Sequence, residues 1–236
     1  MRMKKYQMGM VDYLLVFLTA CVASFALYVY WLSSEGVKYH KINGYTVVEI
    51  DDILSPAECD RLIKYSESQK MVKSEVVDKG GGSSHRLDTN TRNSKTLWIK
   101  DKEHELAMKM ANTANKWTNH PISHQEDLQV VRYEEGGKFE DHYDTQYGST
   151  TESRCATLLV YLNDNYDGGG TTFPEIGLTI LPKKGKGILF WTLDDKNKII
   201  PLAKHRGEKV FRGNKWICTK WTHIKPFTNT YTKSVS

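Results

Sequence analysis

The stretch LQVVRYEEGGKFEDHYD, residues 128–144, combines a predicted strand, a turn and two candidate metal ligands. LQVVRY is rich in β-branched and aromatic residues, which favours a strand, and EEGG directly after it marks a turn. His142 and Asp144 stand at the end of a second extended segment, where residues two apart point to the same face. One imidazole and one carboxylate on a shared face predict part of a metal site, which needs a further ligand from elsewhere in the chain.

Short predicted strands continue on both sides of this stretch, separated by turn signals such as NDNYDGGG and KKGKG. Two helices precede most of them. One begins at Ser55, where Pro56 and Glu58 complete a helix start, and the other is expected over 102–118. The predicted strands are TVVEI (46–50), LQVVRY (128–133), ATLLVYLN (156–163), LTILP (178–182), GILFW (187–191) and KWICTKWTH (215–223). Helices first and short strands afterwards predict an α+β fold whose sheets close as a barrel or a two-sheet sandwich.

Residues 13–32, YLLVFLTACVASFALYVYWL, carry no charge and have the length that a helix needs to cross a bilayer. Basic residues precede the run and aromatic residues close it, so we expect a transmembrane signal anchor with the N-terminus in the cytoplasm. A cleaved signal peptide, a lipoprotein site ending at Cys21 and a buried core helix are the alternatives. The anchor predicts a single-pass protein of the endoplasmic reticulum membrane with a lumenal catalytic domain.

Composition limits the remaining classes. The 236 residues are 39% hydrophobic and 26% charged with a net charge of +5, as in an ordinary globular protein whose lysines are scattered, so we expect no nucleic-acid partner. Cys59, Cys155 and Cys218 form no C-x-x-C pair, which speaks against a zinc site. Whether they make one disulfide or remain three buried thiols is open.

A second histidine is available at His205 or His223. Two histidines and one carboxylate with open positions form the iron site of non-haem oxygenases. We prefer His205, because its segment leads into the strand that begins at Lys215. A lysine buried in a sheet needs a carboxylate, and if the metal also chelates an α-keto acid, Lys215 could hold the far carboxylate of 2-oxoglutarate. Each feature taken singly has a simpler explanation: His142 and Asp144 could be solvated residues of a surface strand, and Lys215 could be a surface lysine.

Four ordered motifs together resemble the catalytic domain of prolyl 4-hydroxylases: RYEEGGKFEDHYD (132–144), YLNDNYDGGGTTFP (161–174), LPKKGKGILFW (181–191) and HRGEKVFRGNKWICTKW (205–221). The resemblance covers about residues 45–226. It implies a double-stranded β-helix core of the jelly-roll or cupin type with flanking N-terminal helices. It also implies a dioxygenase that uses Fe(II), O₂ and 2-oxoglutarate, with ascorbate to rescue oxidised iron, and that hydroxylates proline at the 4-position in proline-rich or collagen-like proteins.

The resemblance also assigns residues. It implies that His142, Asp144 and His205 bind iron, that Lys215 pairs with the distal carboxylate of 2-oxoglutarate, and that Tyr133 and Thr171 help to bind the same molecule. On the peptide side it implies Arg92, Ser94, Phe139 and Trp221. Phe139 departs from the family pattern, which tends to have tyrosine there, so peptide selectivity is in question.

The expected organisation is a short cytoplasmic N-terminus (1–12), the anchor (13–32), a linker (33–44), the catalytic domain (45–227) and a C-terminal tail (228–236). The glycine-rich loop at 77–94 is either a substrate lid or a disordered excursion. Two other functions stay open: the same chemistry on another residue or a small molecule, and a non-catalytic β-barrel binding module. The sequence does not indicate an oligomeric state.

Overall fold

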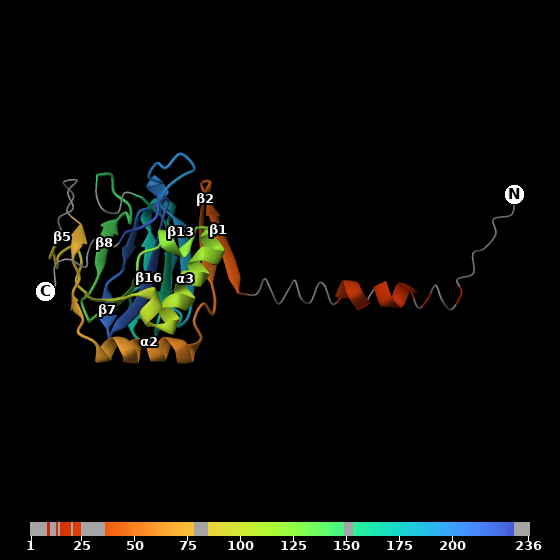
Figure 1. Cartoon of the computed structure of the whole chain (residues 1–236), viewed down its shortest axis with the longest axis horizontal. Coiled ribbons are helices and arrows are strands. Elements are labelled where there is room, and N and C mark those ends of the chain that lie inside the picture. Colours follow the sequence, from red (N-terminus) through yellow and green to blue (C-terminus); the bar gives the residue numbers. More distant parts are fainter. Residues whose placement is uncertain are drawn as a thin grey trace. The chain divides into compact units, whose positions relative to one another are not determined.

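The structure is a computed structural model that describes residues 9, 13, 15–19, 21–24, 36–77, 85–148 and 153–228 (Figure 1). The chain divides into two units, residues 1–37 and 38–236. In the first unit, residues 15–19 and 21–24 are helical and exposed. Among the described residues, no helix has both the length and the apolar character needed to cross a bilayer. The rest of the predicted anchor at 13–32, and the tail beyond residue 228, lie outside the described residues.

Two sheets form the second unit. The large sheet has the strand order β1-β2-β13-β9-β16-β7-β6-β3, and the smaller one has the order β12-β11-β14-β8. The large sheet comprises β1 (Val37–Ile42), β2 (Tyr45–Ile50), β3 (Val72–Lys73), β6 (Lys95–Ile99), β7 (Leu128–Tyr133), β9 (Arg154–Tyr161), β13 (Gly187–Trp191) and β16 (Lys215–His223). The smaller sheet comprises β8 (Phe139–His142), β11 (Thr171–Phe173), β12 (Leu178–Ile180) and β14 (His205–Gly207).

Two short hairpin-like pairs and several helices complete the unit. The pairs are β4 (Val76–Val77) with β5 (His85–Arg86), and β10 (Asp167–Gly168) with β15 (Val210–Arg212). The helices are α2 (Pro56–Ser68), α3 (Glu105–Thr118) and the 3-10 turns η1 (Asp101–Glu103), η2 (Ile122–His124), η3 (Pro174–Ile176) and η4 (Pro201–Ala203). The mostly β core agrees with the predicted double-stranded β-helix.

The core lies between the two sheets. Tyr161 and Phe190 from the large sheet and Phe173 and Ile180 from the smaller one are almost fully buried in a single cluster. Alternate residues of the large sheet point the other way, and α3 packs against β7 and β16 on its outer side (Figure 1). Because side chains alternate along a strand, each central strand supplies both layers, and this explains why β9 and β16 are buried along nearly their whole length.

The helix starts follow local chemistry. At α2 the Ser55 side chain accepts a hydrogen bond from the backbone N–H of Glu58, while the Glu58 carboxylate accepts one from the backbone N–H of Ser55. This is the predicted capping box. The second helix begins later than expected, because residues 101–103 form a 3-10 turn and the His104 side chain caps α3 through the Leu106 N–H.

Two segments differ from expectation. Residues 37–42, predicted as part of a linker, form the edge strand β1. The predicted loop at 77–94 is ordered at its C-terminal end, since Arg92 forms a β-bridge with Phe139 and the Asn93 N–H donates to the Lys138 carbonyl. Residues 78–84, which would form the tip of a lid, lie outside the described residues.

Candidate active site

Three side chains converge at one end of the smaller sheet. His142, the last residue of β8, is the register partner of His205, the first residue of β14. Asp144 lies in a bend just after β8, so it is beyond the strand on which we expected it. One ligand atom from each of the three residues lies within 4.8 Å of the other two, and this group is the candidate metal centre found in the described part of the chain.

Hydrogen bonds orient both imidazoles. His142 Nδ1 lies 2.7 Å from the Glu140 carbonyl oxygen, and His205 Nδ1 lies 3.0 Å from the Ala203 carbonyl oxygen. A carbonyl only accepts, so each Nδ1 carries the proton and each Nε2 presents a lone pair. These Nε2 atoms lie 3.5 and 3.8 Å from the two Asp144 oxygens. Two neutral imidazoles and one carboxylate are the donor set that suits Fe(II) with open positions.

Burial sets the charge state of the group. Burial, followed by the neighbouring His142, lowers the pKa of His205 to about 4, so this imidazole is neutral at physiological pH. Burial opposes ionisation of Asp144, but the adjacent His205 and His142 outweigh it and hold the pKa of that carboxyl well below its usual range. His205 and Asp144 are therefore in the protonation states that a divalent cation requires.

Lys215 lies deeper in the same pocket. It is 2% exposed and pairs in register with Tyr133 across β16 and β7. Its Nζ lies 5.2 Å from the centre of the Tyr133 ring and 5.5 Å from that of Tyr161. Within the described residues it has neither a hydrogen bond nor an ion pair. Burial lowers the pKa of Lys215 to about 7, against the weak opposing effect of Glu208.

The wall around Lys215 contains the other predicted co-substrate residue. Thr171 Oγ1 lies 2.7 Å from the Tyr161 hydroxyl, and Thr171 also lines the pocket. Gly169 packs against the stem of Lys215 with φ +64°, and a Cβ there would lie 2.7 Å from Tyr166 and 3.0 Å from Lys215 Cδ. Glycine is thus required in this part of the GGG run. A free ammonium group with hydroxyl neighbours is suited to one carboxylate of a diacid.

The predicted peptide residues line the same pocket, with one exception. Arg92 Cζ stands 4.8 Å from the centre of the Phe139 ring, and Phe139 in turn stacks on His142 with ring centres 3.5 Å apart. Trp221 also lines the pocket, and its buried Nε1 has no hydrogen-bond partner among the residues described. Ser94 does not line the pocket. It lies behind Arg92, accepts from Arg92 Nε at 3.2 Å and donates to Ser74.

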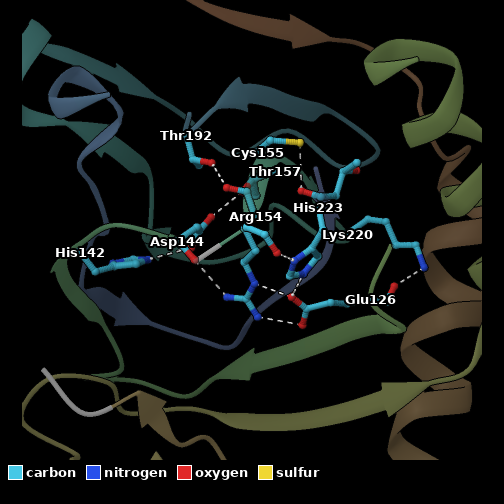
Figure 2. A network of polar contacts seen from close by, with 11 residues as sticks. Glu126, His142, Asp144, Arg154, Cys155, Thr157, Thr192, Lys220 and His223 are labelled. Atoms are coloured by element: carbon cyan, nitrogen blue, oxygen red, sulfur yellow. Dashed lines mark hydrogen bonds and ion pairs between the residues drawn. The ribbon is translucent and has the colours of Figure 1, made fainter. Parts of the chain in front are cut away.

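Several polar residues that the sequence did not single out support the site (Figure 2). Thr157 donates to Asp144 Oδ2 at 2.6 Å, and Arg154 joins Asp144 to the buried Glu126. His223, the alternative metal ligand, lies in this network instead and its Nε2 is 2.7 Å from Glu126. The sequence feature that could have pointed to Thr157 and Arg154 is their polar character within the otherwise apolar run RCATLLVY, residues 154–161.

The cysteines take no part in a disulfide. Cys59, Cys155 and Cys218 are free and buried, which agrees with the thiol alternative.

Comparison with known proteins agrees with this geometry. Residues 128–223 match the model of the 2OG-Fe(II) oxygenase superfamily. Prolyl 4-hydroxylase 5 of Arabidopsis thaliana is 34% identical over 202 residues, which is 75% of this chain and 67% of that protein. A putative prolyl 4-hydroxylase of Acanthamoeba polyphaga mimivirus is 28% identical over 189 residues, 76% of this chain and 74% of that protein.

A solved structure is similar as well. The viral collagen prolyl hydroxylase of Paramecium bursaria Chlorella virus-1, crystallised as a 2OG complex, superposes with a TM-score of 0.59 at 29% identity. The match covers 76% of this chain and 96% of that one.

Proposed function

The chain belongs to the prolyl 4-hydroxylase family of 2OG-Fe(II) oxygenases, and from this premise we propose that it hydroxylates peptidyl proline at the 4-position in proline-rich or collagen-like chains. It is an oxidoreductase whose cofactor is Fe(II) and whose co-substrates are 2-oxoglutarate and O₂. The observation that carries the proposal is the convergence of His142, Asp144 and His205 beside a buried Lys215 that forms no ion pair with any described residue.

The chemistry that Fe(II) supplies when bound is the activation of O₂ with 2-oxoglutarate, which yields succinate, CO₂ and the hydroxylated product. In our proposal His142, Asp144 and His205 hold the metal. Lys215 binds the distal carboxylate of 2-oxoglutarate as a charge-assisted pair, with Tyr133 and Thr171 beside it. The apolar walls, including Leu159 and Ile217, exclude water from this part of the pocket.

The peptide side is assigned to other residues of the same pocket. We propose that Arg92, Phe139 and Trp221 form the wall against which an extended proline-rich chain lies. Aromatic grooves suit polyproline II segments, whose carbonyls are free to accept hydrogen bonds. The Trp221 Nε1–H, buried and without a partner among the described residues, is the donor that we assign to one such carbonyl. Ser94 serves indirectly by holding Arg92.

The test is conversion of 2-oxoglutarate to succinate by the Fe(II)-loaded protein with a collagen-like, a proline-rich and a proline-free peptide. We expect succinate formation to rise with the first two peptides and not with the third. Stimulation by the proline-free peptide, or by small molecules only, would favour the same chemistry on another substrate. No turnover with any of them would favour a binding module.

Membrane attachment is a separate proposal carried by sequence alone. We propose that residues 13–32 anchor the enzyme in the endoplasmic reticulum membrane with a lumenal catalytic unit, because this run is uncharged and flanked as an anchor would be. If so, the full chain stays in the membrane fraction after alkaline extraction, and a chain beginning at Lys38 does not.

We also propose that ascorbate sustains turnover, which a loss of activity over successive turnovers in its absence would test.

A further inference from the structure

Asp144 lies outside the β-ladder that holds the two histidines. His142 and His205 are paired across β8 and β14, but β8 ends at His142 and Asp144 is in the bend that follows. A carboxylate in a bend can rotate about its side-chain bonds, and a metal ligand has to be held within a few tenths of an ångström. The local backbone therefore leaves the third ligand to be positioned by contacts from another element.

Strand β9, which follows Asp144 along the chain and belongs to the large sheet, supplies those contacts (Figure 2). Thr157 Oγ1 donates to Asp144 Oδ2 at 2.6 Å, and Arg154 NH1 donates to the Asp144 main-chain carbonyl at 3.3 Å. One contact fixes the carboxylate and the other fixes the backbone of the same residue. Residues of β9 therefore hold Asp144 at two points, its carboxylate and its main-chain carbonyl.

Thr157 is itself held rigidly. It is 1% exposed and lies in register with Phe190 on one side and with Trp221 on the other. Valine would satisfy the strand and the packing equally well, since it has the same branched shape. The presence of threonine at this position is explained by its hydrogen bond to Asp144, which valine could not make.

Arg154 is equally constrained. Its Nε and NH2 both donate to the carboxylate of Glu126, which is 2% exposed, and its guanidinium lies 3.8 Å from the centre of the Trp221 ring. His223 Nε2 lies 2.7 Å from the same carboxylate. The arginine therefore has little freedom to move away from Asp144.

We propose that Thr157 is a positioning residue for the metal ligand Asp144, with Arg154 fixing the main chain of that ligand. By occupying Oδ2, the hydroxyl orients Oδ1 toward the Nε2 atom of His142 and limits the carboxylate to one orientation. The inference rests on the proposed iron site and goes beyond it, because Thr157, which also lines the pocket, is assigned a role that acts through Asp144 and not through a bond to the metal. Contacts of this kind typically change metal affinity by about 10- to 100-fold when removed.

The test uses the metal-stripped full chain under anaerobic conditions, titrated with Co(II) and followed by its visible absorption spectrum. Thr157→Val should weaken Co(II) binding by about 10-fold or more and alter the spectrum, while Thr157→Ser should restore both. Thr157→Ala provides a second variant without the hydroxyl should valine impair folding. Thr172→Val is the matched control, because that buried hydroxyl lies 2.9 Å from Thr179 Oγ1 in the smaller sheet and is not among the groups that hold Asp144 or Arg154.

The outcomes separate two failures. Wild-type affinity and spectrum in folded Thr157→Val or Thr157→Ala would overturn the positioning role while leaving the enzyme assignment intact. An equal loss in Thr172→Val would also overturn it, since the effect would then not be specific to Asp144. Co(II) binding that survives His142→Ala would instead contradict the proposed iron site itself.

Discussion

Replacing Lys215 by methionine should stabilise the metal-free protein while weakening its affinity for 2-oxoglutarate. The ammonium group is buried without a partner among the described residues, and burial lowers its pKa from 10.5 to about 7. The unfolded chain keeps the ordinary value, so between these two pH values the unfolded state binds more protons and the free energy of unfolding rises with pH. Methionine has a similar length and no charge to bury.

The magnitude follows from the two pKa values. Each pH unit between them is worth about 1.4 kcal/mol, so at about pH 7.5 the lysine costs about 4 kcal/mol of stability. At about pH 9.5 the cost falls to about 1.4 kcal/mol. The stability advantage of Lys215→Met should therefore shrink by more than half over this range.

Urea denaturation of both proteins in the presence of a chelator, at these two pH values, measures the difference. Anaerobic calorimetry on the Mn(II)-loaded proteins measures 2-oxoglutarate affinity, which should fall by about 10- to 100-fold for a lost hydrogen bond to a charged group. Equal or lower stability of the variant near neutral pH, or an advantage that does not change with pH, would refute the assignment of Lys215 as a buried, unpaired lysine.

Three further perturbations have defined outcomes. Asp144→Ala should remove bound iron and all turnover, as read by metal content after desalting; retained iron would mean that other residues bind it. Glu126→Leu leaves Arg154 and His223 without their carboxylate and should cost about 3 to 5 kcal/mol in denaturant unfolding. Burial opposes ionisation of Glu126, but its charged partners outweigh burial and lower the pKa of this carboxyl to about 2. The stability that the ionised Glu126 contributes to the wild-type protein is therefore present above the unfolded pKa of 4.5 and is lost as the pH falls toward 2. The free energies of unfolding of the two proteins should thus converge in acid. Trp221→Phe keeps the aromatic ring but loses the free N–H, and should raise KM for peptide without raising KM for 2-oxoglutarate; a matched rise in both would contradict the peptide role.

The central strands could be predicted because their residue types leave few alternatives. GILFW is an apolar run and KWICTKWTH is rich in aromatic and β-branched residues, each follows a turn signal, and the structure has strands at 187–191 and 215–223 as expected. The edge strand β1, VKYHKI, was missed. None of its side chains is buried, so it carries polar residues and resembles a linker in sequence.

The metal ligands could be predicted for a related reason. His142, Asp144 and His205 lie in motifs whose spacing is characteristic, and two of them are register partners. The supporting residues could not be found this way. Thr157 and Arg154 act across a contact between β9 and a bend, and such a contact depends on the three-dimensional packing of the two elements and not on spacing along the chain. The peptide role that the resemblance implied for Ser94 stays a prediction, and the structure adds that its hydroxyl accepts a hydrogen bond from Arg92 Nε.

The most direct test of prolyl hydroxylation is mass spectrometry of a proline-rich peptide after incubation with the protein, Fe(II), 2-oxoglutarate and O₂, with Asp144→Ala as the matched control. The account predicts a gain of one oxygen atom at C4 of proline, in step with succinate, and neither product with the variant. Succinate without an oxidised proline, or oxygen inserted at another residue, would contradict it.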